Sequence, residues 1–481
     1  MSASTRQTML SAVQAMPAAN PQGRVHTAIA LVLRSPDFIV QKQGATMARS
    51  QPANSRRRRF LQRAARLSAA AGSPLALNLL AIGAACAQWA SARSASAQSA
   101  TDHQALVCIY LSGGNNQSNT VVPTSGAGYA SYLQARLSLA LPAAQLLGWS
   151  PLGYSGQPLG LHPAMGGLKA LFDRQRLAVL AVLAVLANVG SLAVPITQAQ
   201  WNNGSPTVAV PAQLTSHSDQ QGAWQTGLPD RPSETGWLGR IGDLLASAYN
   251  PGSGVTVAMS MAGNNIMQAG DSTIQYPLTT PGAVKVQALG DLFGSAAGAV
   301  ALRRLMTDTR TGLLEGAITA VGARAVSAQA QVSNALSSGA VAGAGAWAVF
   351  PDTGIGRQLQ RVARMIAACD ALAQRRQTFY VMHGGCDFHD NLLNDQGNKL
   401  AELSDAMAAF YRATAAQGVA GNVTTFSASE FGRALQHYGR GSDHGWGSLH
   451  RITGGTVAGK RLYGRFPTVA LGGPGAPARA D

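Results

Sequence analysis

Residues 105–111 read Ala-Leu-Val-Cys-Ile-Tyr-Leu, and the glycine turn Ser-Gly-Gly-Asn-Asn follows at 112–116. A continuous apolar run that contains β-branched residues and ends at a glycine turn is typical of a buried strand in a parallel sheet. Residues 378–382 (TFYVM) and 422–428 (NVTTFSA) are also expected to form strands, and each is again followed by polar residues. Each of these strands is therefore expected to place a polar cluster at its carboxyl end.

Predicted helices separate these strands, at 162–176, 236–248, 290–345, 355–376 and 396–417. Further strands are expected at 177–187 and 255–260, and the Asn-, Gln-, Ser- and Pro-rich residues 188–235 are expected to form a long loop. Strands that alternate with helices indicate an α/β fold, a doubly wound, mostly parallel sheet with helices on both faces. In such sheets ligands bind beyond the carboxyl ends of the strands, where the three polar clusters would meet.

The basic charge of the chain is concentrated at its N-terminus. The formal net charge is +16, with 37 basic and 21 acidic residues. Residues 1–97 contain twelve Arg and Lys but one Asp, which leaves 25 basic and 20 acidic residues, a net charge of +5, over 98–481. This weak, dispersed excess argues against a nucleic-acid partner.

The leader resembles an export signal. Ser55 precedes four arginines and Phe-Leu, an apolar stretch of small residues runs to Ala87, and Ala95-Ser96-Ala97 precedes Gln98. A basic region, an apolar region and an A-x-A site make a signal peptide, and paired arginines before Phe-Leu resemble the twin-arginine motif. Glycine, proline and asparagine in the apolar stretch argue against a stable membrane span. The alternative is a basic, disordered segment with an amphipathic helix.

These features divide the chain into three parts. Residues 1–54 are expected to be a disordered N-terminal extension, with Met47 as an alternative start. Residues 55–97 form the twin-arginine signal peptide, and 98–481 the exported domain. The expected partner is the twin-arginine translocation machinery, and the expected location is periplasmic or secreted.

Four cysteines, at 86, 108, 369 and 386, are too few for a disulfide framework in a chain of this length. Free thiols are expected, and one disulfide pair is the alternative.

Carboxylates and imidazoles collect after the predicted strands. The residues with ligand-type side chains are Asp387, His389, Glu430, Asp443, His444 and His450. Mixed Asp, Glu and His sets bind divalent cations, and such ions assist phosphoryl transfer. The opposing interpretation is that each residue lies on the surface or caps a turn. If a metal site exists, Asp387, His389, Asp443 and His444 should converge, with opposed ligand atoms no more than roughly 5 Å apart.

Ser216 and His217 lie in the polar segment 214–221 together with Asp219. A hydroxyl beside an imidazole and a carboxylate is the arrangement of an activated nucleophile, but an ordinary polar loop has the same composition.

Seven blocks along the chain resemble, in order, a family called domain of unknown function 1501, which is grouped with the alkaline phosphatases and sulfatases. The blocks are LSGGNNQSNTVVP (111–123), LHPAMGGL (161–168), SHSDQQGAWQTG (216–227), GWLGR (236–240), FYVMHGGCDFHDN (379–391), SEFGR (429–433) and DHGWGSLH (443–450). The resemblance covers about 105 to 473. It implies an alkaline-phosphatase-like sheet with metal ligands on strand-end loops, including Asp387 and His389.

The resemblance also implies roles for the remaining residues. Glu430, Asp443 and His444 match the later Asp-His block with His450 as its downstream histidine, and the choice of principal ligand between Glu430 and Asp443 stays open. Ser216, beside His217, takes the nucleophile position. The chain departs from the family at three points. Asn116 replaces a common Asp, Cys386 replaces an aromatic residue, and the chain ends at Asp481 where relatives continue, which implies a shortened C-terminus.

Two functions follow from these features. The first is a metal-dependent hydrolase of phosphate or sulfate esters, with a small anionic ester as substrate and Zn²⁺, Mn²⁺, Mg²⁺ or Ca²⁺ as cofactor. A neutral amide at Asn116 cannot offset a cation's charge, so at most one tightly held ion and slow hydrolysis are expected. The second is a non-catalytic exported binding or assembly protein that keeps the fold.

The export hypothesis predicts the behaviour of arginine variants. Replacing Arg57, Arg58 and Arg59 by Lys should leave unprocessed precursor in the cytoplasm, because Lys does not reproduce the planar guanidinium group. Fractionation and N-terminal sequencing test this, with the wild-type mature chain expected to begin near Gln98. Normal export of the lysine variant would exclude the twin-arginine route.

Overall fold

The computed structural model describes residues 3–17, 20–33, 103–174, 183–190, 200, 211, 213–338, 341, 347–445, 447–464 and 466–471. The predicted signal peptide lies outside the described residues. The chain divides into two compact units, which are Met1–Gln62 with Ala283–Asn334, and Arg63–Gly282 with Ala335–Asp481.

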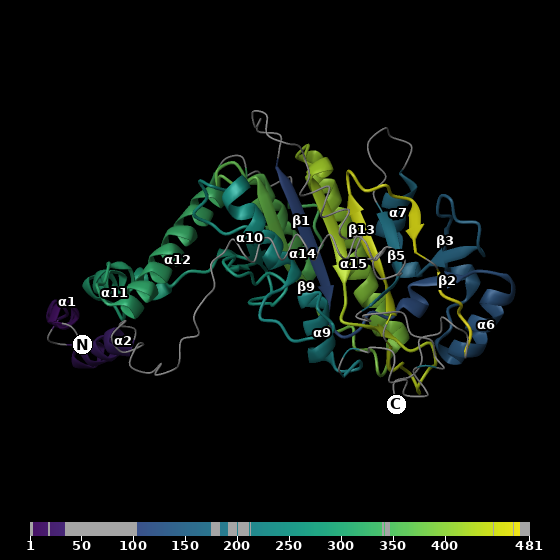
Figure 1. Ribbon diagram of the computed structural model, residues 1–481, viewed down its shortest axis with the longest axis horizontal. Helices are drawn as coiled ribbons and strands as arrows, with labels where there is room; N and C mark the ends of the chain where they lie inside the picture. The colour runs from purple at the N-terminus through teal and green to yellow at the C-terminus, as the bar shows by residue number, and fades with distance from the viewer. Residues whose placement is uncertain are drawn as a thin grey trace. The chain divides into compact units, whose positions relative to one another are not determined.

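The second unit is built on a large mixed sheet (Figure 1). Its strands, in order across the sheet, are β14 (Arg461–Tyr463), β5 (Leu183–Gly190), β13 (Gly447–Gly454), β10 (Val423–Ala428), β1 (Gln104–Leu111), β9 (Arg376–His383), β6 (Ala258–Ser260), β7 (Tyr276–Thr279) and β8 (Gly282–Ala283). The sheet is mostly parallel, as the sequence predicts.

Strand β1 lies between β9 and β10 and is parallel to both. Leu111 pairs with His383 and Tyr110 pairs with Ala428, so the three strands end at the same edge. This confirms that the three polar clusters meet. Strand β13 runs antiparallel to β10 and β5, because the chain turns back after β10 through a loop without a crossover helix.

Helices cover both faces of the sheet. On one face, Tyr110 and Cys108 of β1 share an apolar cluster with Trp224 of α9 (His217–Thr226) and Leu238 of α10 (Trp237–Tyr249). On the other face, β9 side chains reach two more helices. The Gln377 amide donates to a carbonyl of α14 (Gly354–Ala367), and the His383 ring bonds a carbonyl of α15 (Leu392–Ala416). Side chains at alternate positions along a strand therefore contact the helices on opposite faces of the sheet.

The second unit also contains shorter elements. They are the three-stranded sheet β2 (Val121–Pro123), β4 (Leu159–Leu161) and β3 (Leu147–Trp149), the pair β11 (Gly432–Arg433) and β12 (His444–Gly445), and the helices α6 (Gly126–Arg136) and α7 (Gly166–Asp173).

Three predicted boundaries need correction. Helix α9 lies inside the predicted loop 188–235, because its sequence HSDQQGAWQT is mostly polar and shows little apolar periodicity. Helix α14 ends at Ala367 instead of 376, since the chain turns near residues 369–373 before β9 begins. The strand expected at 177–187 is found at Leu183–Gly190, and residues 177–182 lie outside the described part.

The first unit contains α1 (Ala3–Gln14), α2 (Pro21–Leu33) and α11 (Ala296–Thr307), and most of α12 (Leu313–Ser337). Met9 of α1 and Leu31 of α2 are buried in one apolar cluster with Leu302 and Leu305 of α11. The structure thus has helices in the described part of the extension for which the sequence predicted disorder.

Two further expectations concern the described residues. Cys108, Cys369 and Cys386 are free thiols. Among the described helices, none combines the length and apolar character that a membrane span requires.

Gly113 allows the ends of β1 and β9 to approach closely. Its φ is +120°, and an added Cβ would lie 2.4 Å from the backbone nitrogen of Asp387. A side chain at this position would therefore combine backbone strain with a collision against main-chain atoms.

We predict that Gly113→Ala lowers the free energy of unfolding by at least about 2 kcal/mol. Urea denaturation of the purified protein measures this difference. Gly148→Ala is the matched control, because an added Cβ there meets nothing within 4 Å. Equal destabilisation by the two variants would contradict the prediction.

Candidate metal centre

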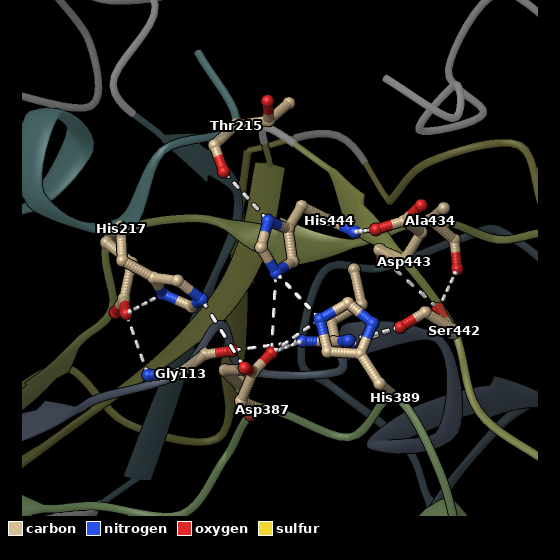
Figure 2. Close-up of polar contacts among 12 residues, drawn as sticks. Gly113, Thr215, His217, Asp387, His389, Ala434, Ser442, Asp443 and His444 are labelled. Carbon is tan, nitrogen blue, oxygen red and sulfur yellow. Dashed lines mark hydrogen bonds and ion pairs between the residues drawn. The ribbon is translucent and has the colours of Figure 1, made fainter. Parts of the chain in front are cut away.

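Asp387 is the centre of a polar cluster at the carboxyl edge of the sheet (Figure 2). It follows strand β9, and its side chain is 43% exposed. Its Oδ1 lies 3.0 Å from His389 Nε2 and 3.3 Å from His444 Nε2, and its Oδ2 lies 3.5 Å from His217 Nε2. Three imidazoles from separate parts of the chain therefore face one carboxylate.

His444 is oriented by the backbone. Its Nδ1 lies 2.8 Å from the Thr215 carbonyl oxygen, which can only accept, so Nδ1 carries the proton. The Nε2 lone pair is then left on the side of Asp387 and His389, whose Nε2 is 3.0 Å away. The structure thus presents His444 Nε2 as the free donor atom for a cation.

His217 is oriented by a buried carboxylate. It is the first residue of α9, and its Nδ1 lies 2.9 Å from Glu430 Oε1. The Glu430 side chain is 1% exposed, and the same oxygen accepts the Gly113 N–H at 2.7 Å. The buried ring of Phe431 packs against His217 and His444, with centroids 4.8 and 4.4 Å apart. A carboxylate behind an imidazole fixes its tautomer, as in many metal centres.

Arg433 holds Asp387 from the protein side. Its buried guanidinium donates to Asp387 Oδ1 at 2.7 Å and to the Gly113 carbonyl oxygen at 3.0 Å. Burial raises the pKa of Asp387, but the hydrogen bond from Arg433, together with the Arg433 charge, outweighs it and holds that pKa well below its usual range. Asp387 is therefore ionised at neutral pH.

His389 is held in its neutral form. Burial, followed by the positive charge of Arg433, lowers the pKa of His389 below its ordinary value. A neutral imidazole keeps the lone pair that a metal ion requires.

Two overlapping sets of side chains have the spacing of metal ligands. They are His217, Asp387 and His444, and His389, Asp443 and His444, with one ligand atom from each residue and all atoms of a set within 4.8 Å of one another. At Zn–N and Zn–O distances of about 2.0–2.2 Å, neighbouring tetrahedral ligands lie about 3.3 Å apart. The Asp387 carboxylate oxygens lie 3.0–3.5 Å from the three imidazole Nε2 atoms, which matches this ligand–ligand distance. The residues present therefore fit a divalent ion.

The structure brings together most of the residues that the sequence singles out. Asp387, His389, Asp443 and His444 converge, and His217 joins them, although the sequence suggests it as a partner of the nucleophile. Glu430 contacts His217 from behind, outside both ligand sets. Whether these residues bind a metal stays a prediction.

His450 lies apart from the cluster and belongs to neither ligand set. It is 1% exposed in β13, and its ring packs edge-on against Trp224 at 5.5 Å. Its Nε2 has no hydrogen-bond partner among the described residues. His450 follows His444 by six residues in the sequence, but it already lies within β13 (Gly447–Gly454). This strand places the His450 side chain on the Trp224 side of the sheet.

The side chains of Ser216 and Asn116 form hydrogen bonds outside the ligand cluster. Ser216 precedes α9, and its Oγ lies 3.2 Å from Ser218 Oγ. The fully buried amide of Asn116 donates to Gln396 Oε1 on α15 at 2.7 Å. Asn116 thus fixes the loop after β1 to α15, and it contacts none of the ligand side chains through these bonds.

Two residues of the cluster are missed by sequence reasoning. Arg433 appears in the sequence only as part of a family block, and Thr215 acts through its carbonyl oxygen. Arginine after a strand usually lies on the surface, and a backbone carbonyl carries no residue-type signal, so only the structure reveals their roles.

The fold and cluster define an α/β protein with a candidate metal centre at the carboxyl ends of parallel strands. Residues 103–473 match the family model described as protein of unknown function (DUF1501), and the chain therefore belongs to that family. No curated protein and no solved structure matches the chain.

The buried His450 predicts acid sensitivity. Burial, with a smaller contribution from the Arg451 charge, lowers the pKa of His450 to about 3. Between about pH 6.5, the pKa of an unfolded His, and pH 3, the unfolded chain takes up a proton that the folded chain does not. Stability is thus retained above pH 6.5 and lost as the pH falls.

We expect His450→Gln to lessen this loss by about 1.4 kcal/mol per pH unit between pH 6 and 4. Urea denaturation at a series of pH values measures both slopes. Parallel slopes for the variant and the wild type would show that His450 is not the group responsible.

Proposed function

We propose that this protein is an exported, metal-dependent hydrolase of phosphate or sulfate esters with an alkaline-phosphatase-like fold. The observation that carries the proposal is the convergence of three imidazoles on Asp387 at the carboxyl edge of the sheet. Imidazoles beside an ionised carboxylate at a partly exposed edge form a donor set that suits a divalent transition-metal ion.

The donor set favours a transition metal over Mg²⁺ or Ca²⁺. Imidazole nitrogen suits Zn²⁺ and related ions, whereas Mg²⁺ and Ca²⁺ prefer sites made of oxygen atoms. The two ligand sets share His444, whose Nδ1 is already bonded to the Thr215 carbonyl oxygen. Its remaining Nε2 can ligate one ion at a time. One divalent ion per chain is therefore proposed, with Zn²⁺ as the first candidate and Mn²⁺ as the second.

Residues around the site would have separate roles in holding the ion and its ligands. Arg433 occupies Asp387 Oδ1, which leaves Oδ2 on the side of His217 for the ion. Glu430 fixes the His217 ring, and Thr215 fixes the His444 ring. The bound ion would supply Lewis acidity towards an ester oxygen. The side chains of His217 and His389 are 40% and 48% exposed, so a small anionic ester can reach them from solvent.

Ser216 remains the proposed nucleophile. It precedes His217 at the N-terminal end of α9, where backbone N–H groups favour a developing negative charge on the hydroxyl. Its Oγ lies 3.2 Å from Ser218 Oγ.

A specific observation favours the second candidate, a non-catalytic exported binding or assembly protein. Asp387 Oδ1 already accepts from Arg433 and faces two imidazoles, so the protein's own groups satisfy much of the cluster. A closed network of this kind could stabilise the strand ends without any ion. Metal binding and ester hydrolysis must therefore be tested separately.

The metal prediction is tested on the full chain stripped with a chelator. We expect one Zn²⁺ per chain, with affinity lowered at least about 100-fold in His444→Gln, because both ligand sets lose a member. Isothermal titration calorimetry and elemental analysis give affinity and stoichiometry. His437→Gln is the matched control, since His437 is in neither set and should leave binding unchanged. Two tightly bound ions, or none, would contradict the single-ion proposal.

The hydrolase prediction is tested with the Zn²⁺- or Mn²⁺-loaded protein and a panel of phosphate and sulfate monoesters. We expect slow turnover that His444→Gln abolishes and that Ser216→Ala lowers by at least about 100-fold. Turnover that survives Ser216→Ala would exclude Ser216 as nucleophile but keep the hydrolase. Tight metal binding without turnover of any ester would support the non-catalytic protein.

A further inference from the structure

Arg451 is a buried cation whose guanidinium group has no hydrogen-bond partner among the described residues. It lies in β13, its residue is 1% exposed, and its backbone N–H donates to Ser427 Oγ at 3.0 Å. Nε, Nη1 and Nη2 of the guanidinium all lack a partner among the described residues. Burying a charge without compensation is strongly unfavourable, so the fold must supply a counter-charge or solvent at this point.

Other buried arginines of this unit show what is missing. Arg433 pairs with Asp387 and with carbonyl oxygens. Arg136, also fully buried, donates to Asn119 Oδ1 and to the carbonyl oxygens of Ala434 and Leu435. Arg451 differs from both, although its burial is the same.

No described carboxylate compensates Arg451. Burial lowers the pKa of Arg451 to about 10, and the one acidic neighbour that opposes this effect is the Cys386 thiol. Burial raises the pKa of that thiol to about 12, so the thiol is neutral at physiological pH. Within the described part of the chain, the positive charge of Arg451 therefore has no negatively charged partner.

The surroundings of Arg451 offer a second donor. Its strand neighbours His450 and Ile452 pack on the Trp224 side of the sheet, so Arg451 points to the opposite face. His162 lies on that face, since an added Cβ at Gly397 of α15 would be 3.7 Å from its Cε1. His162 Nδ1 accepts the Ala164 N–H at 3.1 Å, which places its ring proton on Nε2. Burial and then the charge of Arg451 lower the pKa of His162, so the two side chains are within range of each other's charge.

We propose that Arg451 binds a small monovalent anion, namely chloride, inside the fold on the α15 side of the sheet. A single negative charge neutralises one guanidinium, whereas a divalent anion would leave a buried negative charge in its place. The guanidinium N–H groups would bind the ion, with His162 Nε2–H as an additional donor. The site is separate from the metal centre and does not depend on the proposed hydrolysis.

The test measures thermal stability of the full chain in sodium chloride against sodium gluconate at constant ionic strength. Because a ligand that binds only the folded state raises its stability, we expect the melting temperature to rise by roughly 2 °C for each tenfold increase in chloride above its Kd. Arg451→Met should abolish this dependence. Arg136→Met, which removes a buried but partnered arginine, should keep it.

Crystals grown in bromide give a direct readout that needs no variant. An anomalous peak at hydrogen-bond distance from the Arg451 guanidinium supports the proposal even if Arg451→Met fails to fold. Water molecules alone around the guanidinium would overturn it, and so would identical melting temperatures in chloride and gluconate.

Discussion

The buried carboxylate of Glu430 is the constraint on which the candidate centre depends. Its Oε1 accepts the Gly113 N–H and faces His217 Nδ1, at 2.7 and 2.9 Å. A carboxylate that is 1% exposed is tolerated only when such partners compensate its desolvation. One side chain therefore ties the turn after β1 and the first residue of α9 to the end of β10, and the orientation of His217 follows from it.

The sequence predicts the frame of this structure well. The apolar run of β1 is continuous, which is the pattern of a strand buried on both faces. The polar residues that follow β1, β9 and β10 mark one edge of the sheet. Neighbouring parallel strands have their carboxyl ends at the same edge of a sheet. The convergence of Asp387 with His444 could therefore be anticipated from the sequence. The proposed likeness to alkaline phosphatases and sulfatases implies residue roles, and these roles remain part of the proposal.

The sequence could not predict how the cluster is held. Helix α9 is mostly polar and reads as a loop, yet Trp224 alone anchors it in the apolar cluster beneath the sheet and brings His217 to the edge. Residue type and the family resemblance single out His444 and His450 equally, and only the start of β13 separates a partly exposed position from a buried one. Arg433 and the Thr215 carbonyl orient Asp387 and His444 through hydrogen bonds. Where these groups point depends on tertiary packing, which the sequence pattern does not reveal.

The contacts of the centre also determine when it can form. His217 and Glu430 are 213 residues apart, Thr215 and His444 are 229 apart, and Gly113 and Glu430 are 317 apart. Closing such long loops is slow, because the chain entropy is lost before the contacts are gained. The cluster is therefore assembled among the last parts of this unit. Partly folded chains then hold its imidazoles and carboxylates apart, so an ion bound at the proposed centre would mark a chain that has finished folding.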